Sequence, residues 1–302
     1  MRTWIIGLTL MAILAMAGAV MAQDKPATGT TTPGATTTAP VKPALDPANC
    51  IWAIVLDKGI KVTVAGKDNE KPTVNEKAIS VYFATVDGKA AVAFCSTPTY
   101  NKGTHEIDAS DLKVVDGVVK GTLKVTINAD AWVPADKKPV AGEYVIEATA
   151  KDAVVTGTFT GKYGTTETAG TITGKLVNKR QVENVKVTLN LENALTECEP
   201  YISRAIINYQ ITKGKVGNAK ISTSLKDKWK GKVTTNSLVL TADTLTGDIV
   251  ADITSNTYGN SAGKYTFTFD GKVLGNIVFG TIKRKLDDKD LKDLGTFTGT
   301  LE

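Results

Sequence analysis

The sequence GTITGKL at residues 170–176 recurs as GTFTGTL at residues 295–301. Five of the seven positions are identical, and the two copies lie 125 residues apart. Each copy closes a run in which apolar and polar residues alternate. Similarity at a long and nearly fixed period indicates a duplicated structural unit. The chain is therefore predicted to be a tandem repeat.

Further matches extend the repeat. IKVTV at residues 60–64 matches VKVTL at residues 185–189, and Tyr82 matches Tyr209. A longer pattern of apolar residues around one glycine also recurs, with Val119, Gly121, Leu123 and Ile127 matching Leu245, Gly247, Ile249 and Ile253. The offset drifts by a few residues, as insertions in surface loops between equivalent strands would produce.

These matches divide the folded part of the chain into two β units. We expect the first at residues 50–178 and the second at residues 183–302. Residues 51–56 have no counterpart among the matches, so an extra strand outside the repeat is expected there.

Within each copy the apolar residues recur with a period of two, which is typical of strands. Residues 119–127 place Val, Leu and Ile on one face and Lys and Thr on the other. Asp87-Gly88 and Asp270-Gly271 fall between such runs and suit tight hairpin turns. Eight such runs are found in each copy. The prediction is an all-β fold, a tandem repeat of two antiparallel eight-stranded units that are up-and-down, calycin-like barrels or sandwiches.

Closure into a barrel is attractive because it removes exposed strand edges. Glycines alternate with large apolar residues along several runs, which would relieve crowding where a sheet curves sharply. We expect six large side chains in the barrel interiors: Val125, Phe159, Ile172, Ile253, Ile277 and Phe297.

GTFTGKY at residues 157–163 resembles strands of avidin-type proteins. The lipocalin-like and avidin-like families have eight-stranded barrels of this style, so the resemblance implies a fold. It does not extend to binding residues, because the Gly-x-Trp motif of those families is absent. Trp52 follows Cys50-Ile51 instead.

The N-terminus is predicted to direct export. Residues 1–22 have a positive Arg2, an apolar run and small residues at the end, as secretory signal peptides do. An uncleaved anchor of about 18 apolar residues is the alternative. No Cys follows the apolar run, so the usual lipoprotein route is not expected. The expected location is extracytoplasmic, in the periplasm, on the cell surface or secreted.

Residues 23–49 are predicted to be a disordered linker. Residues 24–47 hold five of the ten prolines and seven threonines. Such a composition cannot bury enough apolar surface to offset the entropy of ordering. A passive spacer and a glycosylated stalk both fit this composition.

The chain offers little catalytic chemistry. His105 is the single histidine and has no second histidine or thiol beside it, so a solvated loop residue is the interpretation preferred over a metal site or triad. Asp287, Asp288, Asp290 and Asp293 alternate with lysines and lack the spacing of a calcium loop. We expect a non-catalytic protein without a cofactor or metal.

Three cysteines follow the predicted signal peptide: Cys50, Cys95 and Cys198. A disulfide between Cys50 and Cys95 would close a loop of 45 residues and contribute about 3–4 kcal/mol if unstrained. Cys198 would then be an exposed thiol or an intermolecular partner, while a pairing of Cys198 with Cys95 is the alternative.

One stretch suggests a surface partner, with a tryptophan set among four lysines: Lys226, Lys228, Trp229, Lys230 and Lys232. An exposed indole flanked by ammonium groups could stack on a sugar or a base. Packing of Trp229 against its own barrel is the preferred alternative. The net charge of +5 is mild for a nucleic-acid binder, so no nucleic acid is expected.

These observations leave three classes of function. A binding module would hold a small apolar ligand in a barrel interior, or a cell-surface glycan on its surface. A structural spacer at the cell surface would need no ligand. An integral outer-membrane barrel is the third class, but aromatic residues are only 6% of the chain and lysines alternate along the strands, so no membrane span is expected after signal removal.

Overall fold

The computed structural model describes residues 45–64, 71–97, 105–127, 139–192, 194–195, 205–223, 229–255, 262–291 and 294–302. The predicted signal peptide, and the predicted linker as far as residue 44, lie outside these ranges. Across the described residues, no helix has both the length and the apolar character needed to cross a bilayer.

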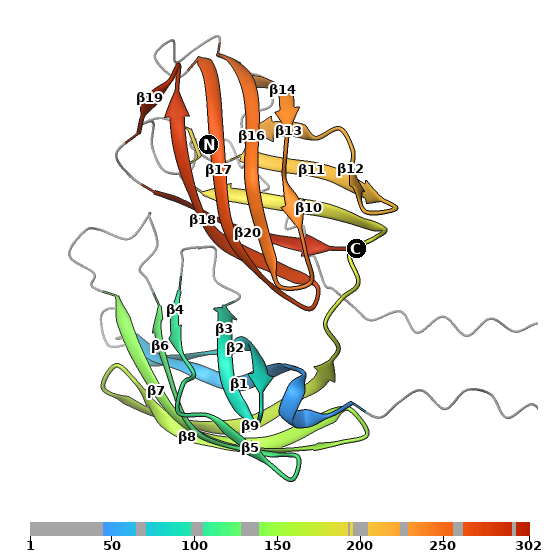
Figure 1. Cartoon of the computed structure of the whole chain (residues 1–302). Coiled ribbons are helices and arrows are strands. Elements are labelled where there is room, and N and C mark those ends of the chain that lie inside the picture. The colour runs from blue at the N-terminus through green and yellow to red at the C-terminus, as the bar shows by residue number, and fades with distance from the viewer. Residues whose placement is uncertain are drawn as a thin grey trace, which may run out of the picture. The chain divides into compact units, whose positions relative to one another are not determined.

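The first sheet contains nine strands within the described ranges. They are β1 (Ile51–Val64), β2 (Thr73–Val86), β3 (Lys89–Ser96), β4 (Glu106–Asp108), β5 (Lys113–Val115), β6 (Val118–Ile127), β7 (Val140–Lys151), β8 (Val154–Tyr163) and β9 (Thr166–Val177). Pairing runs from β1 through β2, β3, β5, β6, β7 and β8 to β9, which returns to β1 (Figure 1). The seam between β3 and β5 is one residue pair, Lys89 opposite Lys113. The sheet is therefore a nearly closed barrel.

The second sheet contains eleven strands within the described ranges. They are β10 (Val185–Glu192), β11 (Ala205–Thr212), β12 (Lys215–Val216), β13 (Lys220–Thr223), β14 (Trp229–Asn236), β15 (Val239–Leu240), β16 (Thr244–Ser255), β17 (Gly263–Leu274), β18 (Ile277–Leu286), β19 (Lys289–Asp290) and β20 (Gly295–Leu301). Its main path is β12-β11-β10-β20-β18-β17-β16-β14, and every ladder is antiparallel. The all-β tandem architecture predicted from the sequence is confirmed.

Hairpin turns connect the strands where the sequence places Asp-Gly or Lys-Gly pairs. Asp87 and Gly88 have φ of 49° and 73°, which is the left-handed pair of a type I′ turn. The predicted turn at Asp270-Gly271 is wrong, because both residues lie inside β17. Gly271 serves packing there: a Cβ on it would lie 2.5 Å from the Phe297 ring.

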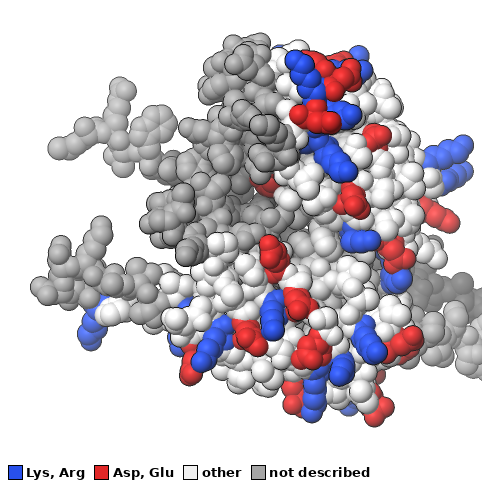
Figure 2. Space-filling model, turned by 60° about the vertical axis from the view of Figure 1, so that its left-hand side comes forward, with Lys and Arg blue, Asp and Glu red and all other residues white. Residues whose placement is uncertain are grey.

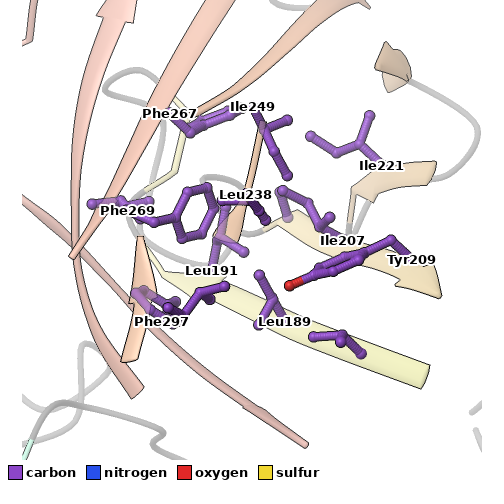
Figure 3. Close-up of a cluster of buried hydrophobic side chains, with 14 of the residues drawn as sticks. Leu189, Leu191, Ile207, Tyr209, Ile221, Leu238, Ile249, Phe267, Phe269 and Phe297 are labelled. Atoms are coloured by element: carbon purple, nitrogen blue, oxygen red, sulfur yellow. The ribbon is translucent and has the colours of Figure 1, made fainter. Parts of the chain in front are cut away.

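Each sheet encloses a separate apolar cluster. In β7 the residues Gly142, Tyr144, Ile146 and Ala148 are buried and alternate with exposed ones. One face of each strand is therefore inside and the other is in water, as the period of two predicts. The second cluster is drawn in Figure 3, where Phe269, Phe297 and Leu191 converge from three strands.

Five of the six residues expected in the interiors are buried. Val125, Phe159, Ile172, Ile253 and Phe297 are each 1–2% exposed. Ile277 is only half-buried, and its neighbour Val278 is fully buried in its place. A shift of one residue along a strand moves a side chain to the opposite face, so Ile277 points out of the barrel.

The extra strand predicted at residues 51–56 is wrong. These residues begin β1 and pair with β9, just as β10 pairs with β20. Leu56 stands opposite Ile172, and Leu191 stands opposite Phe297. Because residues 172 and 297 are matched positions of the repeated heptapeptide, residues 51–56 are the counterpart of β10. The match of residues 60–64 with residues 185–189 joined non-equivalent parts of two strands.

The N-terminal edge of the first sheet includes part of the predicted linker. Residues 47–49 form a short 3₁₀ helix, η1 (Pro47–Asn49), and the Pro47 carbonyl oxygen accepts hydrogen bonds from Trp52 Nε1 and Thr85 Oγ1, both at 3.0 Å. These hydrogen bonds tie residues 47–49 to the end of the barrel, so the first folded unit includes residues that the sequence assigned to the linker.

Candidate functional site

The two cysteines predicted to form a disulfide are both free and buried. Cys95 stands opposite Val81, and Val81 stands opposite Ile54, which is four residues along β1 from Cys50. Two strand spacings and four residues separate the Cα atoms by roughly 16 Å, whereas a disulfide requires less than about 7 Å. The predicted pairing is therefore absent for a geometric reason. Cys198 lies outside the described residues.

Burial makes these thiols poor nucleophiles. It raises the pKa of Cys50 to about 11 and that of Cys95 to about 12. Thiolate is the reactive form, so neither cysteine suits covalent catalysis at neutral pH.

His105 is half-buried rather than solvated. Its Nε2 atom lies 3.1 Å from Thr97 Oγ1, and its Nδ1 atom has no hydrogen-bond partner among the described residues. Burial lowers the pKa of the imidazole. Within the described ranges, no group of three His, Cys, Asp or Glu side chains is placed to hold a metal ion.

The lysine and tryptophan stretch is only partly described. Lys226 and Lys228 lie outside the described residues, whereas Trp229, Lys230 and Lys232 belong to β14. From residue 229 onward the stretch is thus a strand. Lys230 and Lys232 are exposed, and Lys232 stands opposite Asp252 on β16.

Charges are also mixed elsewhere on the surface. On the face shown in Figure 2, basic and acidic side chains are interspersed and do not separate by sign. Proteins that bind nucleic acid gather lysine and arginine on one face, so this face lacks that electrostatic footprint.

Large aromatic side chains occupy the interior of each sheet. In the first sheet Trp52 stacks on Phe83 with ring centroids 5.8 Å apart. In the second sheet Phe269 and Phe297 meet edge to face at 5.1 Å. Aromatic rings therefore pack against one another inside each sheet.

A groove of about 560 Å³ lies on the first sheet, where strands β1, β8 and β9 meet. It is lined by Lys61, Thr160, Gly161, Lys162, Glu167, Thr168 and Ala169. Its volume falls within the range of about 300–1,000 Å³ typical of ligand sites. Two ammonium groups, one carboxylate and two hydroxyl groups belong to the residues that line it, although most of the exposed area of the lining is apolar.

An irregularity in β1 opens this groove. The ladder between β1 and β9 ends at Leu56 opposite Ile172, and the register of β1 against β2 shifts between Leu56 and Ile60. Lys58 has a left-handed φ of 59°, and its carbonyl oxygen accepts a hydrogen bond of 2.6 Å from Thr168 Oγ1. Such bulges bend a strand away from its neighbour, and here the bend separates β1 from β9.

The second repeat differs at the matching place. Gly157 stands opposite Ile172 and Gly280 stands opposite Phe297, which makes the two glycines equivalent. Four residues further along each strand, Gly161 of the first repeat corresponds to Arg284 of the second. Arg284 is 7% exposed, and its Nη1 atom donates to the Leu195 carbonyl oxygen at 3.2 Å. A long buried side chain thus stands where the first repeat has a glycine in the groove.

Sequence reasoning missed this groove. Its one signal was the triplet Asp57-Lys58-Gly59, a turn-like sequence inside an apolar run. The contrast of Gly161 with Arg284 becomes visible only after the strand registers have aligned the repeats.

Comparisons with family models, with curated proteins and with solved structures give no match to this chain. Function is therefore inferred from the geometry of the groove and of the two interiors.

Proposed function

We propose that this is an exported, non-catalytic binding module and that the groove of the first repeat holds a polar ligand. The observation that carries the proposal is the groove itself, a space of about 560 Å³ bordered by Lys61, Lys162 and Glu167. Charged and hydroxyl groups that converge on a concave surface give a site both orientation and specificity.

The lining favours a polar ligand over the small apolar ligand expected from the sequence. Lys61 and Lys162 supply ammonium donors, Glu167 supplies a carboxylate acceptor, and the hydroxyl of Thr160 can donate or accept. An apolar molecule would leave these groups without partners. A glycan or another ligand rich in hydrogen-bonding groups fits them better.

The interior positions give less support to a ligand inside a barrel. The side chains of Phe159, Ile172 and Phe297 are at most 2% exposed and lie among other large side chains. A ligand there would have to displace side chains that already fill a dense core.

Calorimetric titration of the full chain with neutral and acidic oligosaccharides tests this function. A double variant, Lys61→Ser with Lys162→Ser, should weaken binding by at least about tenfold, because each lost charge-assisted hydrogen bond is worth about 1.5–3 kcal/mol. Lys285→Ser is the matched control, because Lys285 occupies the position of Lys162 in the second repeat. Equal weakening by both variants would count against the groove.

A structural spacer is the second candidate, and the filled interiors favour it. Two solid barrels without a ligand would make a rigid unit at the end of the predicted linker. In that case no ligand would change the stability of the protein, whereas a ligand of the native state raises its melting temperature.

A further inference from the structure

Two buried apolar residues lie outside both barrel cores. Ile51 of β1 and Leu274 of β17 are each 2% exposed, but among the described residues neither belongs to the apolar cluster of its own sheet. Their chain neighbours Trp52 and Val273 do belong to those clusters. Because side chains alternate along a strand, Ile51 and Leu274 point out of their barrels. Their burial therefore needs a cover that their own barrel does not supply.

The first sheet and the second sheet contact each other at these outer faces. Gly275 stands in the turn between β17 and β18, and a Cβ on it would lie 3.4 Å from Val177 Cγ1 and 3.9 Å from Ile51 Cδ1. The rings of Phe279 on β18 and Phe94 on β3 have centroids 4.6 Å apart. Both rings are half-buried. Groups of the second repeat thus cover apolar groups of the first.

The matching strand ends of the second repeat are charged. Ile51 pairs with Val177 in the first repeat, and the equivalent pair in the second repeat is Lys186 with Glu302. The side chains of that pair are exposed and form an ion pair at 3.2 Å. A salt bridge in water therefore replaces two apolar side chains at the same place in the repeat.

The two aromatic rings also have polar counterparts. On the strand that pairs with β2 or β11, the register places Lys220 where the first repeat has Phe94. Thr156 is the counterpart of Phe279, because each directly precedes the equivalent glycine of its strand. Lys220 and Thr156 are both exposed.

The residue type at these positions follows what covers them. Leu274 continues the pattern, since the register makes exposed Lys151 its counterpart. The local fold does not require an apolar residue at such a position, because the other repeat builds the same strand with a polar one. These apolar residues occur in the copy in which the position meets the other repeat.

We propose that the outer face formed by Ile51, Phe94 and Val177 is a docking surface for the β17–β18 hairpin, and that the two repeats therefore form one rigid body. Apolar side chains that leave water on both sides stabilise such a contact, and the aromatic rings supply much of its area. Domains that lack a hydrophobic interface are expected to move independently.

The connection between the repeats favours docking within one chain. Only seven residues, 178–184, separate β9 from β10. A short tether gives its two ends an effective concentration on the order of millimolar. Arg180 of this connection donates from Nη1 to the Leu301 carbonyl oxygen at 2.7 Å, which holds the connection against the second repeat.

The polar counterparts also restrict the contact to two units. The contact joins two different faces, and contacts of this kind between identical units continue into open arrays. A further unit would meet only the polar counterparts: Lys186, Lys220 and Glu302 on the second repeat, and Lys151 and Thr156 on the first. Polar outer faces end a repeat array, as capping repeats do. The full-length protein is therefore expected to be monomeric.

Residual dipolar couplings of the backbone amides in the full-length protein test this docking. Couplings from both repeats should fit one alignment tensor, as those of one rigid body do. The variant Phe94→Lys with Phe279→Thr gives each position the residue of its counterpart, so each repeat should keep its fold while the two repeats require separate tensors. The control variant, Lys220→Thr with Thr156→Lys, changes only the outer faces and should keep the single tensor.

Separate tensors in the wild-type protein would overturn the proposal, and so would one shared tensor in the variant of Phe94 and Phe279. Couplings that fit within each repeat show that its fold is intact, and Phe279→Thr alone repeats the test if the double variant unfolds. Sedimentation velocity at increasing concentration should give a constant monomer mass. Wild-type dimers that Phe94→Lys dissociates would identify a second copy as the partner and overturn docking within the chain. No ligand is used, so these results are independent of the groove.

Discussion

Gly121 and Gly247 occupy the same position in the two repeats. Their φ values are 143° and 111°, both in the region that disfavours residues with a Cβ. A Cβ on Gly121 would lie 3.1 Å from Leu112 Cα, and a Cβ on Gly247 would lie 3.1 Å from Leu238 Cα. The same backbone conformation and the same close approach have thus been kept in both copies.

Alanine at either glycine should destabilise its own repeat. Gly121→Ala and Gly247→Ala should each cost about 2–4 kcal/mol, since backbone strain adds to the clash with the facing backbone at Leu112 or Leu238. Chemical denaturation followed by fluorescence measures the loss. Gly214→Ala is the control, because Gly214 has a φ of 73° but no heavy atom within 4 Å of the added Cβ, so only strain of about 1–2 kcal/mol is expected. Equal losses in all three variants would contradict the role of the close approach.

The buried thiols should make stability fall at high pH. Folding raises the pKa of Cys50 to about 11 and that of Cys95 to about 12 from an ordinary value of 9.0. The folded state therefore holds these protons more tightly. The protonated thiols therefore contribute to the free energy of unfolding fully below about pH 9, and this contribution is lost as pH rises toward 12.

Replacement of both residues, Cys50→Ala with Cys95→Ala, should flatten the pH dependence of the unfolding free energy between pH 9 and 11. Thiol labelling in the native state should also be slow at these two positions and complete after denaturation. Recovery of a peptide that links Cys50 to Cys95 under non-reducing conditions would contradict the strand register.

Two asparagines cap the same turn in the two repeats. The Asp87 backbone N–H donates to Asn49 Oδ1, and the Lys213 backbone N–H donates to Asn184 Oδ1, both at 3.0 Å. Asn49→Ala and Asn184→Ala should each cost about 1 kcal/mol. The loss should be larger at Asn49, which also donates from Nδ2 to Asp46 at 2.8 Å. Melting temperatures measure both, and the exposed Asn276→Ala variant should be neutral.

Tyr209 holds a hydroxyl inside the second cluster (Figure 3). Its side chain is buried, and the hydroxyl has no hydrogen-bond partner among the described residues. Burial of an unpaired hydroxyl costs about 1–3 kcal/mol. Tyr209→Phe should therefore leave the unfolding free energy unchanged or raise it. A clear loss of stability would show that the hydroxyl is satisfied in solution.

The equivalent position of the first repeat provides the reverse test. Phe83 stands opposite Trp52 of β1, and Tyr209 stands opposite Val187 of β10. Because Trp52 and Val187 occupy matching places in the repeat, Phe83 is the counterpart of Tyr209. Phe83→Tyr should lower stability by about 1–3 kcal/mol, because it buries a new hydroxyl in an apolar cluster. Stability that stayed at the wild-type level would indicate a hidden partner at this site.

Strand periodicity and glycine positions could be predicted from the sequence. The alternation along residues 119–127 gave the buried face of β6 correctly, and the match of Gly121 with Gly247 identified truly equivalent residues. Both signals work because a buried face or a close backbone approach restricts the residue types that fit.

Register within a strand was harder to predict. The sequence predicts Ile277 in the interior, but its neighbour Val278 is the buried residue. It also matches Tyr82 with Tyr209, but the strand registers make Phe83 the counterpart of Tyr209. Both errors are shifts of one residue, and a run of consecutive apolar residues does not show which member faces the core.

The candidate site could not be predicted because it depends on a change of strand direction. Lys61 and Lys162 are 101 positions apart in the sequence, and the groove that they share exists only because β1 bends at Lys58. The predicted disulfide failed for a related reason, because loop length alone carries no information on the separation of two positions across a sheet.

Amide chemical-shift mapping of the isotopically labelled full chain, titrated with the oligosaccharides described above, distinguishes a ligand site in the groove from one in an interior. We expect the largest shifts for any ligand that binds to fall at Thr160, Gly161, Glu167, Thr168 and Ala169, with Lys283, Arg284 and Lys285 unaffected. Shifts centred on the interior residues Tyr209 and Phe297, or spread equally over both repeats, would contradict it.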